Sequence, residues 1–133
     1  MTKQELIDLA FTAMENAYAP YSNYHVGACV LCKDGRTYLG ANIENASFGL
    51  TNCAERSAIF SAYSNGVRKD DIEALAIVSD GPYVAAPCGA CRQVLCELMN
   101  EDTPIHLSNR KETCTKTISE LLPMSFGGKD LEG

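Results

Sequence analysis

The segment from Asn52 to Arg56 places a thiol, a carboxyl and a guanidinium within four consecutive residues. A thiolate binds soft metal ions, a carboxyl can carry protons, and a guanidinium can balance excess negative charge. A second segment, from Pro87 to Cys91, offers two more thiols at the C-x-x-C spacing that is typical of metal ligands. Together the two segments predict one zinc site with its own acid/base group.

The candidate ligands are Cys53, Cys88 and Cys91. Three thiolates leave a tetrahedral zinc ion with one open position for water, which is the arrangement of catalytic sites rather than structural ones. Pro87 suits the first turn of a helix, where exposed amides and the positive end of the helix dipole favour thiolates. Because Cys53 lies at the start of another predicted helix, we expect two helix N-termini to converge on one ion.

Three thiolates around a divalent ion leave the site with excess negative charge, which weakens the Lewis acidity of the metal. A nearby cation restores it by hydrogen bonding to the sulfurs. Arg56 lies three residues after Cys53 and hence on nearly the same helix face. Arg92, directly after Cys91, is a second candidate for this charge-balancing role.

Glu55 lies two residues after Cys53, in the first turn of the same predicted helix. There it can stand beside the open zinc position, take a proton from bound water and return it to a leaving group. The alternative is a structural role, in which Glu55 closes a capping box on Asn52. The presence of both cysteine motifs favours the catalytic interpretation.

Composition restricts the class of protein. The chain has 133 residues, 46% of them hydrophobic and 21% charged, as expected for about one globular domain. The net charge of -6, without a basic patch, argues against a polynucleotide partner. No apolar segment is long enough to cross a bilayer, and the first residues lack the features of a signal peptide. An odd number of cysteines, seven, favours reduced thiols, so we expect a cytoplasmic protein.

The rest of the chain predicts an α/β scaffold that holds the two cysteine segments. Predicted helices run from a Thr2–Glu5 capping box to Pro20, from Cys53 to about Gly66 with Asn52 or Thr51 as cap, from Pro87 through Leu98, and over 119–122. Predicted strands cover 26–33, 37–41, 72–79, 104–107 and 114–118, with a hairpin turn at 34–35 and a loop over 42–52. The unbroken apolar residues of 72–79 indicate a strand that is buried on both faces.

The other cysteines and the two histidines are predicted to be structural. They are Cys29, Cys32, Cys96, Cys114, His25 and His106. The first two again form C-x-x-C, but an odd separation within a strand points their side chains to opposite faces. The other two cysteines are expected to act as small buried hydrophobes, and neither histidine has a metal partner at a telling spacing.

The combination of Cys53-Ala54-Glu55 with Pro87-Cys88-Gly89-Ala90-Cys91 is the three-cysteine form of the known zinc-deaminase signature. Beyond this signature, the chain closely resembles the small, homotetrameric, zinc-dependent cytidine deaminases of pyrimidine salvage. The resemblance extends over nearly the whole chain and is carried by the segments 21–22, 26–28, 42–47, 52–56, 88–93, 121–123 and 126–127.

The resemblance implies one domain over residues 1–133 with a three-layer α-β-α fold, in which a mixed five-stranded sheet has helices on both faces. It implies hydrolysis of cytidine and 2′-deoxycytidine to uridine and 2′-deoxyuridine with release of ammonia. In that reaction zinc-bound hydroxide attacks C4 of the base and Glu55 shuttles the protons. The implied cofactor is Zn²⁺, one per subunit. The implied partners are a small nucleoside and further copies of the chain in a homotetramer.

The resemblance also assigns residues to substrate binding. They are Asn42 and Glu44 for the sugar 3′-hydroxyl, the Ala54 amide and Ala86 carbonyl for the base, Tyr24 beside the pyrimidine ring, and Phe126 from a neighbouring subunit. The chain departs from the common family residues at Tyr24 (phenylalanine), Phe48 (tyrosine), Ala86 (serine or threonine) and Gly128 (proline). A sugar-binding carboxylate favours nucleosides over free cytosine and repels the phosphate of a nucleotide.

Two other functions are compatible with a zinc site. One is deamination of a cytosine nucleoside antibiotic of the blasticidin S type, although the Asn42 and Glu44 pair favours an ordinary nucleoside. The other is a structural zinc-binding module, which needs a fourth protein ligand to close the site. No fourth ligand is evident at a suitable spacing in the sequence.

Overall fold

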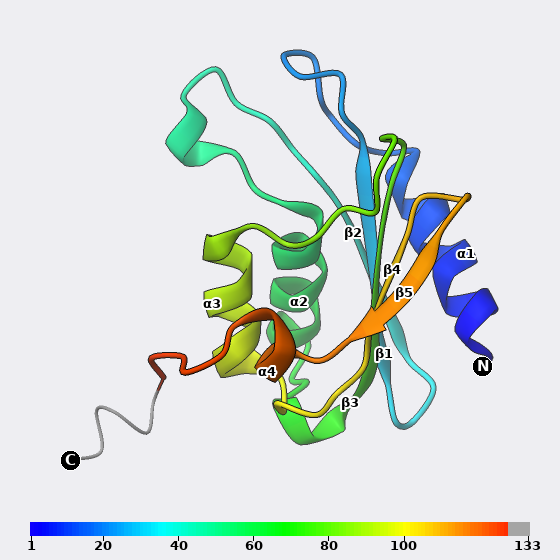
Figure 1. Cartoon of the computed structure of the whole chain (residues 1–133), viewed down its shortest axis with the longest axis vertical. Coiled ribbons are helices and arrows are strands. Elements are labelled where there is room, and N and C mark those ends of the chain that lie inside the picture. The colour runs from blue at the N-terminus through cyan, green and yellow to red at the C-terminus, as the bar shows by residue number, and fades with distance from the viewer. Residues whose placement is uncertain (128–133) are drawn as a thin grey trace.

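A mixed five-stranded sheet, with strand order β2-β1-β3-β4-β5, is the centre of the computed structural model, which describes residues 1–127 (Figure 1). The strands are β1 (Val26–Cys32), β2 (Thr37–Ala41), β3 (Ile72–Ser79), β4 (Ile105–Ser108) and β5 (Thr113–Lys116). The α-helices are α1 (Lys3–Met14), α2 (Ala54–Ser64), α3 (Gly89–Leu98) and α4 (Ile118–Leu121), with short 3-10 turns η1 (Phe48–Leu50) and η2 (Lys69–Asp71). Within the described residues, no helix has the length and apolar character needed to span a membrane.

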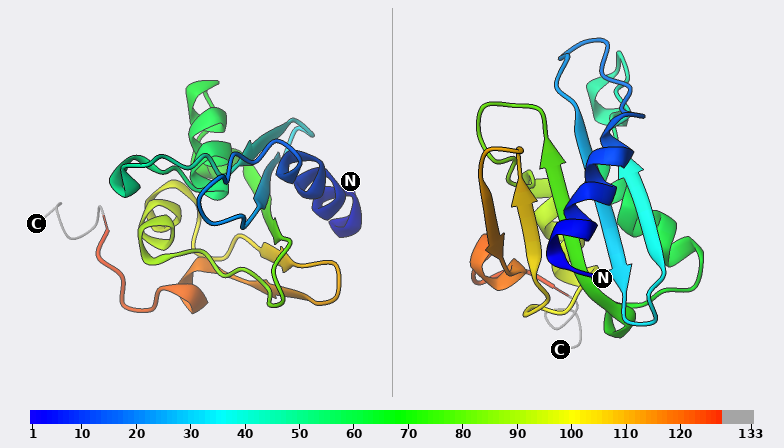
Figure 2. Two further views of the ribbon diagram at one scale, coloured as in Figure 1. Left: turned by 90° about the horizontal axis from the view of Figure 1, so that it is seen from above. Right: turned by 90° about the vertical axis from the view of Figure 1, so that its right-hand side faces the viewer.

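The sheet mixes both strand orientations. β3 and β4 run parallel, and every other neighbouring pair is antiparallel. Helix α1 covers one face of the sheet, while α2, α3 and α4 lie on the opposite side (Figures 1 and 2). This arrangement confirms the predicted α/β fold with a mixed five-stranded sheet and helices on both faces.

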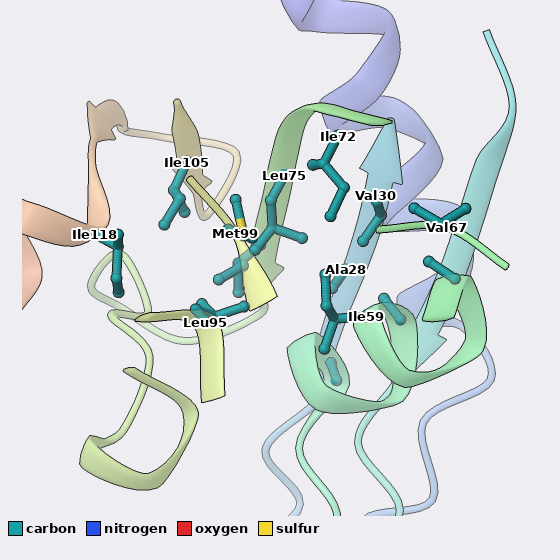
Figure 3. Close-up of a cluster of buried hydrophobic side chains, with 14 of the residues drawn as sticks. Ala28, Val30, Ile59, Val67, Ile72, Leu75, Leu95, Met99, Ile105 and Ile118 are labelled. Atoms are coloured by element: carbon teal, nitrogen blue, oxygen red, sulfur yellow. The ribbon is translucent and has the colours of Figure 1, made fainter. Parts of the chain in front are cut away.

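The two central strands, β1 and β3, are buried on both faces. Side chains at alternate positions of β1 enter two separate clusters of buried hydrophobic residues. Ala28 and Val30 face α2, and Figure 3 shows Ala28 beside Ile59 of that helix. The larger cluster therefore lies on the side of the sheet that carries both cysteine-bearing helices.

Most predicted elements are confirmed within a few residues, and two predictions about helix ends are wrong. Helix α1 has the predicted capping box of Thr2 and Glu5, but it ends at Met14 and does not continue to Pro20. The N-cap of α2 is Cys53, and not Asn52 or Thr51.

Gly40 of β2 allows α2 to lie directly on the sheet. A Cβ atom at this position would come within 2.4 Å of the backbone nitrogen of Ala58 and 2.5 Å of the carbonyl oxygen of Ala54. Both of these atoms belong to the backbone of α2, and neither can move without the helix. The absent side chain thus fixes the height of the first turn of α2, which follows directly on Cys53.

We expect Gly40→Ala to lower the free energy of unfolding by about 1–3 kcal/mol, because the new methyl group pushes α2 away from the sheet. Thermal unfolding of the purified variant measures this loss. The control is Gly49→Ala, where a Cβ meets nothing within 4 Å, and a change of at most about 0.5 kcal/mol is expected. Equal melting temperatures for both variants would contradict the close approach.

Candidate metal centre and active site

Two helix N-termini each begin with a cysteine. Cys53 is the N-cap of α2 and Cys88 is the N-cap of α3. Their carbonyl groups accept the first intrahelical hydrogen bonds, from Ser57 and Arg92, both at 2.9 Å. The first amides of each helix have no intrahelical acceptor, so both helix starts present positive partial charge to a thiolate.

The structure brings Cys53, Cys88 and Cys91 together. Their sulfur atoms all lie within 4.8 Å of one another, and the Sγ atoms of Cys88 and Cys91 are 3.5 Å apart. Cys91 is fully buried, Cys53 is half-buried and Cys88 is exposed. The cluster therefore opens toward solvent on the side of Cys88.

The donor set of this cluster fits zinc. Three sulfur ligands from Cys53, Cys88 and Cys91 match the preference of zinc for thiolates, and a tetrahedral ion keeps one position for a small molecule. Within residues 1–127, no fourth histidine, cysteine, aspartate or glutamate joins the group. An incomplete protein ligand set is the property that separates catalytic zinc sites from structural ones.

Arg56 lies directly against the cluster. Its Nη2 atom donates a hydrogen bond of 3.3 Å to Cys53 Sγ. Its Nε atom is also buried and finds no hydrogen-bond partner within residues 1–127. The contact with Cys53 raises the pKa of Arg56, so the guanidinium stays charged beside the sulfurs.

The thiols share their charge unequally. The pKa of Cys53 is lowered to about 5, mainly by a hydrogen bond from Cys91 and to a smaller extent by Arg56. The same hydrogen bond and burial raise the pKa of Cys91. By itself, the cluster therefore favours the thiolate at Cys53 and the thiol at Cys91, and a divalent cation would provide the charge that stabilises a thiolate at Cys91.

Glu55 is the second residue of α2 and is only 5% exposed. Burial, together with the negative charge of Cys53, raises the pKa of its carboxyl to about 7. A carboxyl with this pKa gives and takes protons with similar ease near neutral pH. The capping box with Asn52 does not form, because Cys53 is the N-cap and Asn52 Nδ2 donates instead to Ser57 Oγ at 3.0 Å.

Arg92 lies next to Cys91 in sequence, but its hydrogen bonds lead away from the sulfurs. Its Nε atom donates to the Pro87 carbonyl and its Nη1 atom to the Leu121 carbonyl, both at 2.7 Å. These bonds tie the start of α3 to α4. Of the two arginines predicted to balance charge, Arg56 is the one that hydrogen bonds to a candidate ligand within residues 1–127.

Asn42 is held in one orientation. It is 8% exposed, its Oδ1 accepts from the Val26 amide at 2.9 Å, and its Nδ2 donates to the Tyr24 carbonyl at 2.8 Å. The amide oxygen can accept one more hydrogen bond, and the amide nitrogen can donate one more. Asn42 thus stabilises the segment before β1 and can still hydrogen bond to a polar group of a ligand.

Glu44 is oriented by the segment before β1. One carboxylate oxygen accepts from the amides of Tyr21 at 3.0 Å and Ser22 at 3.2 Å, and the other accepts from the Ser22 hydroxyl. These bonds, led by the one from the Ser22 hydroxyl, lower the pKa of Glu44, so it is charged at neutral pH. The sequence did not assign a role to Ser22, although it lies within a segment of the family resemblance.

The other residues that the family resemblance assigns to substrate binding come from separate places in the chain. Ala54 is the first residue of α2 and fully buried, Ala86 lies in the irregular segment before α3, and Tyr24 is 38% exposed. Phe126 is 59% exposed, and its carbonyl accepts from Gln93 Nε2 at 2.8 Å. A surface hollow of about 590 Å³ lies beside this C-terminal segment, and the three clustered cysteines do not line it. Gly128 lies outside the described residues.

The residues predicted to be structural lie away from the cysteine cluster. Cys29 and Cys32 enter opposite hydrophobic clusters, as predicted. Cys96 and Cys114 are only half-buried and pack at the edge of the larger cluster. The sequence did not reveal the partner of His25, whose Nδ1 lies 2.6 Å from an oxygen of the Asp80 carboxylate.

Comparison with known proteins agrees with this geometry. The family pattern described as the cytidine and deoxycytidylate deaminase zinc-binding region matches residues 1–107. A cytidine deaminase of Halalkalibacterium halodurans is 52% identical over 132 residues, which cover 98% of this chain and 98% of that protein. The cytidine deaminase of Sporosarcina psychrophila is 46% identical, covering 98% of this chain and 96% of that protein.

Solved structures lead to the same family. The crystal structure of cytidine deaminase from Burkholderia pseudomallei matches with a TM-score of 0.91 and 45% identity, covering 95% of this chain and 100% of that chain. The cytidine deaminase of Mycobacterium tuberculosis matches with a TM-score of 0.80 and 38% identity, covering 96% and 98% of the two chains. The chain belongs to the cytidine and deoxycytidylate deaminase family.

Proposed function

We propose that the chain hydrolyses cytidine and 2′-deoxycytidine to uridine and 2′-deoxyuridine, consuming water and releasing ammonia in pyrimidine salvage. The observation that carries this proposal is the meeting of Cys53, Cys88 and Cys91 at two helix N-termini, with the buried carboxyl of Glu55 in the same first turn. Hydrolytic deamination at C4 of a cytosine ring needs activated water and a proton carrier, and this arrangement would supply both once a metal is bound.

The three cysteines would hold one Zn²⁺ per subunit. When bound there, zinc supplies the Lewis acidity that makes water nucleophilic at neutral pH. Arg56 draws negative charge away from the sulfur of Cys53 through its hydrogen bond, which preserves that acidity. Arg92 supports the same cluster indirectly, by fixing the Pro87 carbonyl next to Cys88.

Glu55 carries the protons of the reaction. It takes one proton from water and delivers it to the ring nitrogen N3 as the C4–O bond forms. It then takes the second proton from the new hydroxyl on C4 and transfers it to the amino group, which leaves as ammonia when the C4–N bond breaks and the C4 carbonyl forms. A pKa raised to about 7 suits this alternation, since the same group must act first as a base and then as an acid.

The backbone and Tyr24 orient the base. The amide of Ala54 is the first of helix α2, so it has no intrahelical acceptor and is free to donate to a substrate. The carbonyl of Ala86 is a matching acceptor in the segment before α3. If only this backbone carbonyl is used, alanine in place of the more common serine or threonine should have a mild effect. The ring of Tyr24 would lie beside the pyrimidine.

The sugar is recognised by Asn42 and Glu44, whose orientations are already fixed by neighbouring backbone groups. Both can hydrogen bond to the 3′-hydroxyl, which free cytosine lacks. The negative charge of Glu44 also disfavours a 5′-phosphate nearby. These two contacts support an ordinary nucleoside over a free base, a nucleotide or an antibiotic.

We also propose that four chains assemble and complete one another's pockets. Several large apolar side chains are well exposed on the single chain; they are Phe48, Leu50, Tyr83, Met124 and Phe126. Exposed apolar groups of this size are typical of surfaces that bury against a partner. In this arrangement Phe126 enters the pocket of a neighbour and shields the exposed side of Cys88.

The free state of all seven cysteines supports a reducing, cytoplasmic location.

A substrate panel tests the proposed activity. We expect the purified, zinc-loaded protein to convert cytidine and 2′-deoxycytidine. The loss of their ultraviolet absorbance measures the reaction. Cytosine, cytidine monophosphate and blasticidin S should remain unchanged in parallel reactions. Cytosine and blasticidin S lack the sugar contacts of an ordinary nucleoside, and the phosphate of cytidine monophosphate is disfavoured by the charge of Glu44. Absence of cytidine turnover would refute the proposed function, and turnover of blasticidin S alone would favour the antibiotic alternative.

Glu55→Gln tests the proton carrier. The amide has the shape of the carboxyl but cannot cycle a proton, so we expect the rate to fall by about 10²–10⁴-fold. Zinc content, measured by atomic emission, should stay unchanged because Glu55 is not a ligand. Cys91→Ser is expected to lose both zinc and activity, and Glu97→Gln, an exposed position on α3, should retain both. A Glu55→Gln protein with normal turnover would leave Glu55 without a catalytic role.

Sedimentation equilibrium tests the assembly. We expect a single species with the mass of four chains of 14.4 kDa each. Phe126→Ala should lower cytidine turnover in that tetramer, since the ring completes a neighbour's pocket. A fully active monomer would contradict the proposed sharing of pockets.

A further inference from the structure

His25 and Asp80 join two segments that are far apart in the sequence. The two carboxylate oxygens of Asp80 accept from the His25 backbone amide at 3.0 Å and meet His25 Nδ1 at 2.6 Å. In return, the Asp80 amide donates to the His25 carbonyl at 3.2 Å. Both segments lie at the same end of the sheet, beyond the start of β1 and the end of β3 (Figure 1).

This pair places the ring of Tyr24 against Gly81. Tyr24 directly precedes His25, and Gly81 directly follows Asp80. A Cβ atom on Gly81 would lie 2.7 Å from the Cε1 atom of Tyr24, so the ring packs closely on the glycine backbone. Asn109 holds the other side of this contact, since its Nδ2 donates to the Gly81 carbonyl at 3.3 Å.

The same contacts extend to the residues proposed to bind the sugar. The Tyr24 amide donates to Ser22 Oγ at 3.0 Å, and that hydroxyl in turn donates to Glu44. The Tyr24 carbonyl accepts from Asn42 at 2.8 Å. Tyr24 is therefore held through its amide, its carbonyl and its ring, and only the ring contact depends on Gly81.

Asp80 also begins the segment that leads to Ala86 and Cys88. The side chains of His25 and Asp80 are 34% and 39% exposed. An ion pair with this exposure adds little to overall stability, because solvent screens it. What the pair does fix is the distance between the aromatic ring on one segment and the segment that continues to the metal cluster.

We propose that Asp80, acting through His25, is a positioning residue that sets the affinity for the pyrimidine by holding the Tyr24 ring against Gly81. This inference rests on the proposed function, since it concerns the same pocket. The pair acts on binding of the base and leaves proton transfer by Glu55 unaffected. Its hydrogen bonds, and not its charge, maintain the geometry.

Steady-state kinetics of Asp80→Ala test the proposal. We expect KM for cytidine to rise about tenfold while kcat stays within about twofold, the pattern of lost binding that is equal in ground and transition states. The dissociation constant of uridine, measured by calorimetry, should rise by the same factor. Zinc content should remain that of the wild type, which separates a displaced ring from a damaged metal cluster.

Asp34→Ala is the matched control. Asp34 accepts from the backbone amide of Arg36 at 3.0 Å and from its Nε at 2.7 Å, the same pattern that Asp80 shows toward His25. It lies in the turn between β1 and β2, at the opposite end of the sheet (Figure 1). We expect both kinetic constants of this variant to equal those of the wild type.

Three further variants separate position from charge. Asp80→Asn and His25→Asn each retain a group able to hydrogen bond across the pair, so KM should stay within about threefold of the wild type. Gly81→Ala leaves the pair intact but moves the Tyr24 ring, so it should raise KM as Asp80→Ala does. The proposal would be overturned if KM of Asp80→Ala were unchanged, or if kcat fell by as large a factor as KM rose. A wild-type protein without cytidine turnover would instead refute the proposed function.

Discussion

The site depends on two helix N-termini that meet so closely that the sulfur atoms of their cysteines lie side by side. Neither helix can move independently, since α2 lies against Gly40 of the sheet and α3 is anchored in the larger core by Leu95. The sheet thereby determines where Cys53 and Cys88 face each other. Helix dipoles and Arg56 then make this an environment in which sulfur carries negative charge. In the proposed function, metal affinity, proton transfer and charge balance would all follow from this one juxtaposition.

Local pattern was sufficient to predict most of the fold. The apolar residues from 72 to 79 and the turn at 34–35 leave few alternatives to strands and a hairpin. The end of α1 was not predictable in this way. Tyr18 continues the helical periodicity, but its backbone amide bonds to the Asn42 carbonyl and its carbonyl accepts from the Glu44 amide. Long-range backbone pairing thus overrides a local helical preference.

The same reason explains the wrong cap. Asn52 has a good capping side chain, yet its amide and carbonyl pair with Ile43, which moves the helix start to Cys53.

In the site, residue types and spacing pointed to Cys53, Cys88, Cys91 and Glu55 as a group. The pairing of His25 with Asp80 could not be predicted from the sequence. The strand register that sets Val26 opposite Ser79 brings the two residues together, and no local sequence pattern encodes that register.

The use of cysteine as N-cap has a consequence for how the protein folds. Neither Cys53 nor Cys88 makes a side-chain capping hydrogen bond, while a serine or aspartate there would contribute about 1 kcal/mol to each helix. The chain gives up this local stability at both helix starts. Under the proposed function, an ion that binds all three sulfurs would restrain both first turns at once, so metal binding would be coupled to the stability of both helix starts. The proposed zinc ion would thus replace the missing side-chain cap at both helices, and amide exchange in these turns would report how fully the protein is loaded.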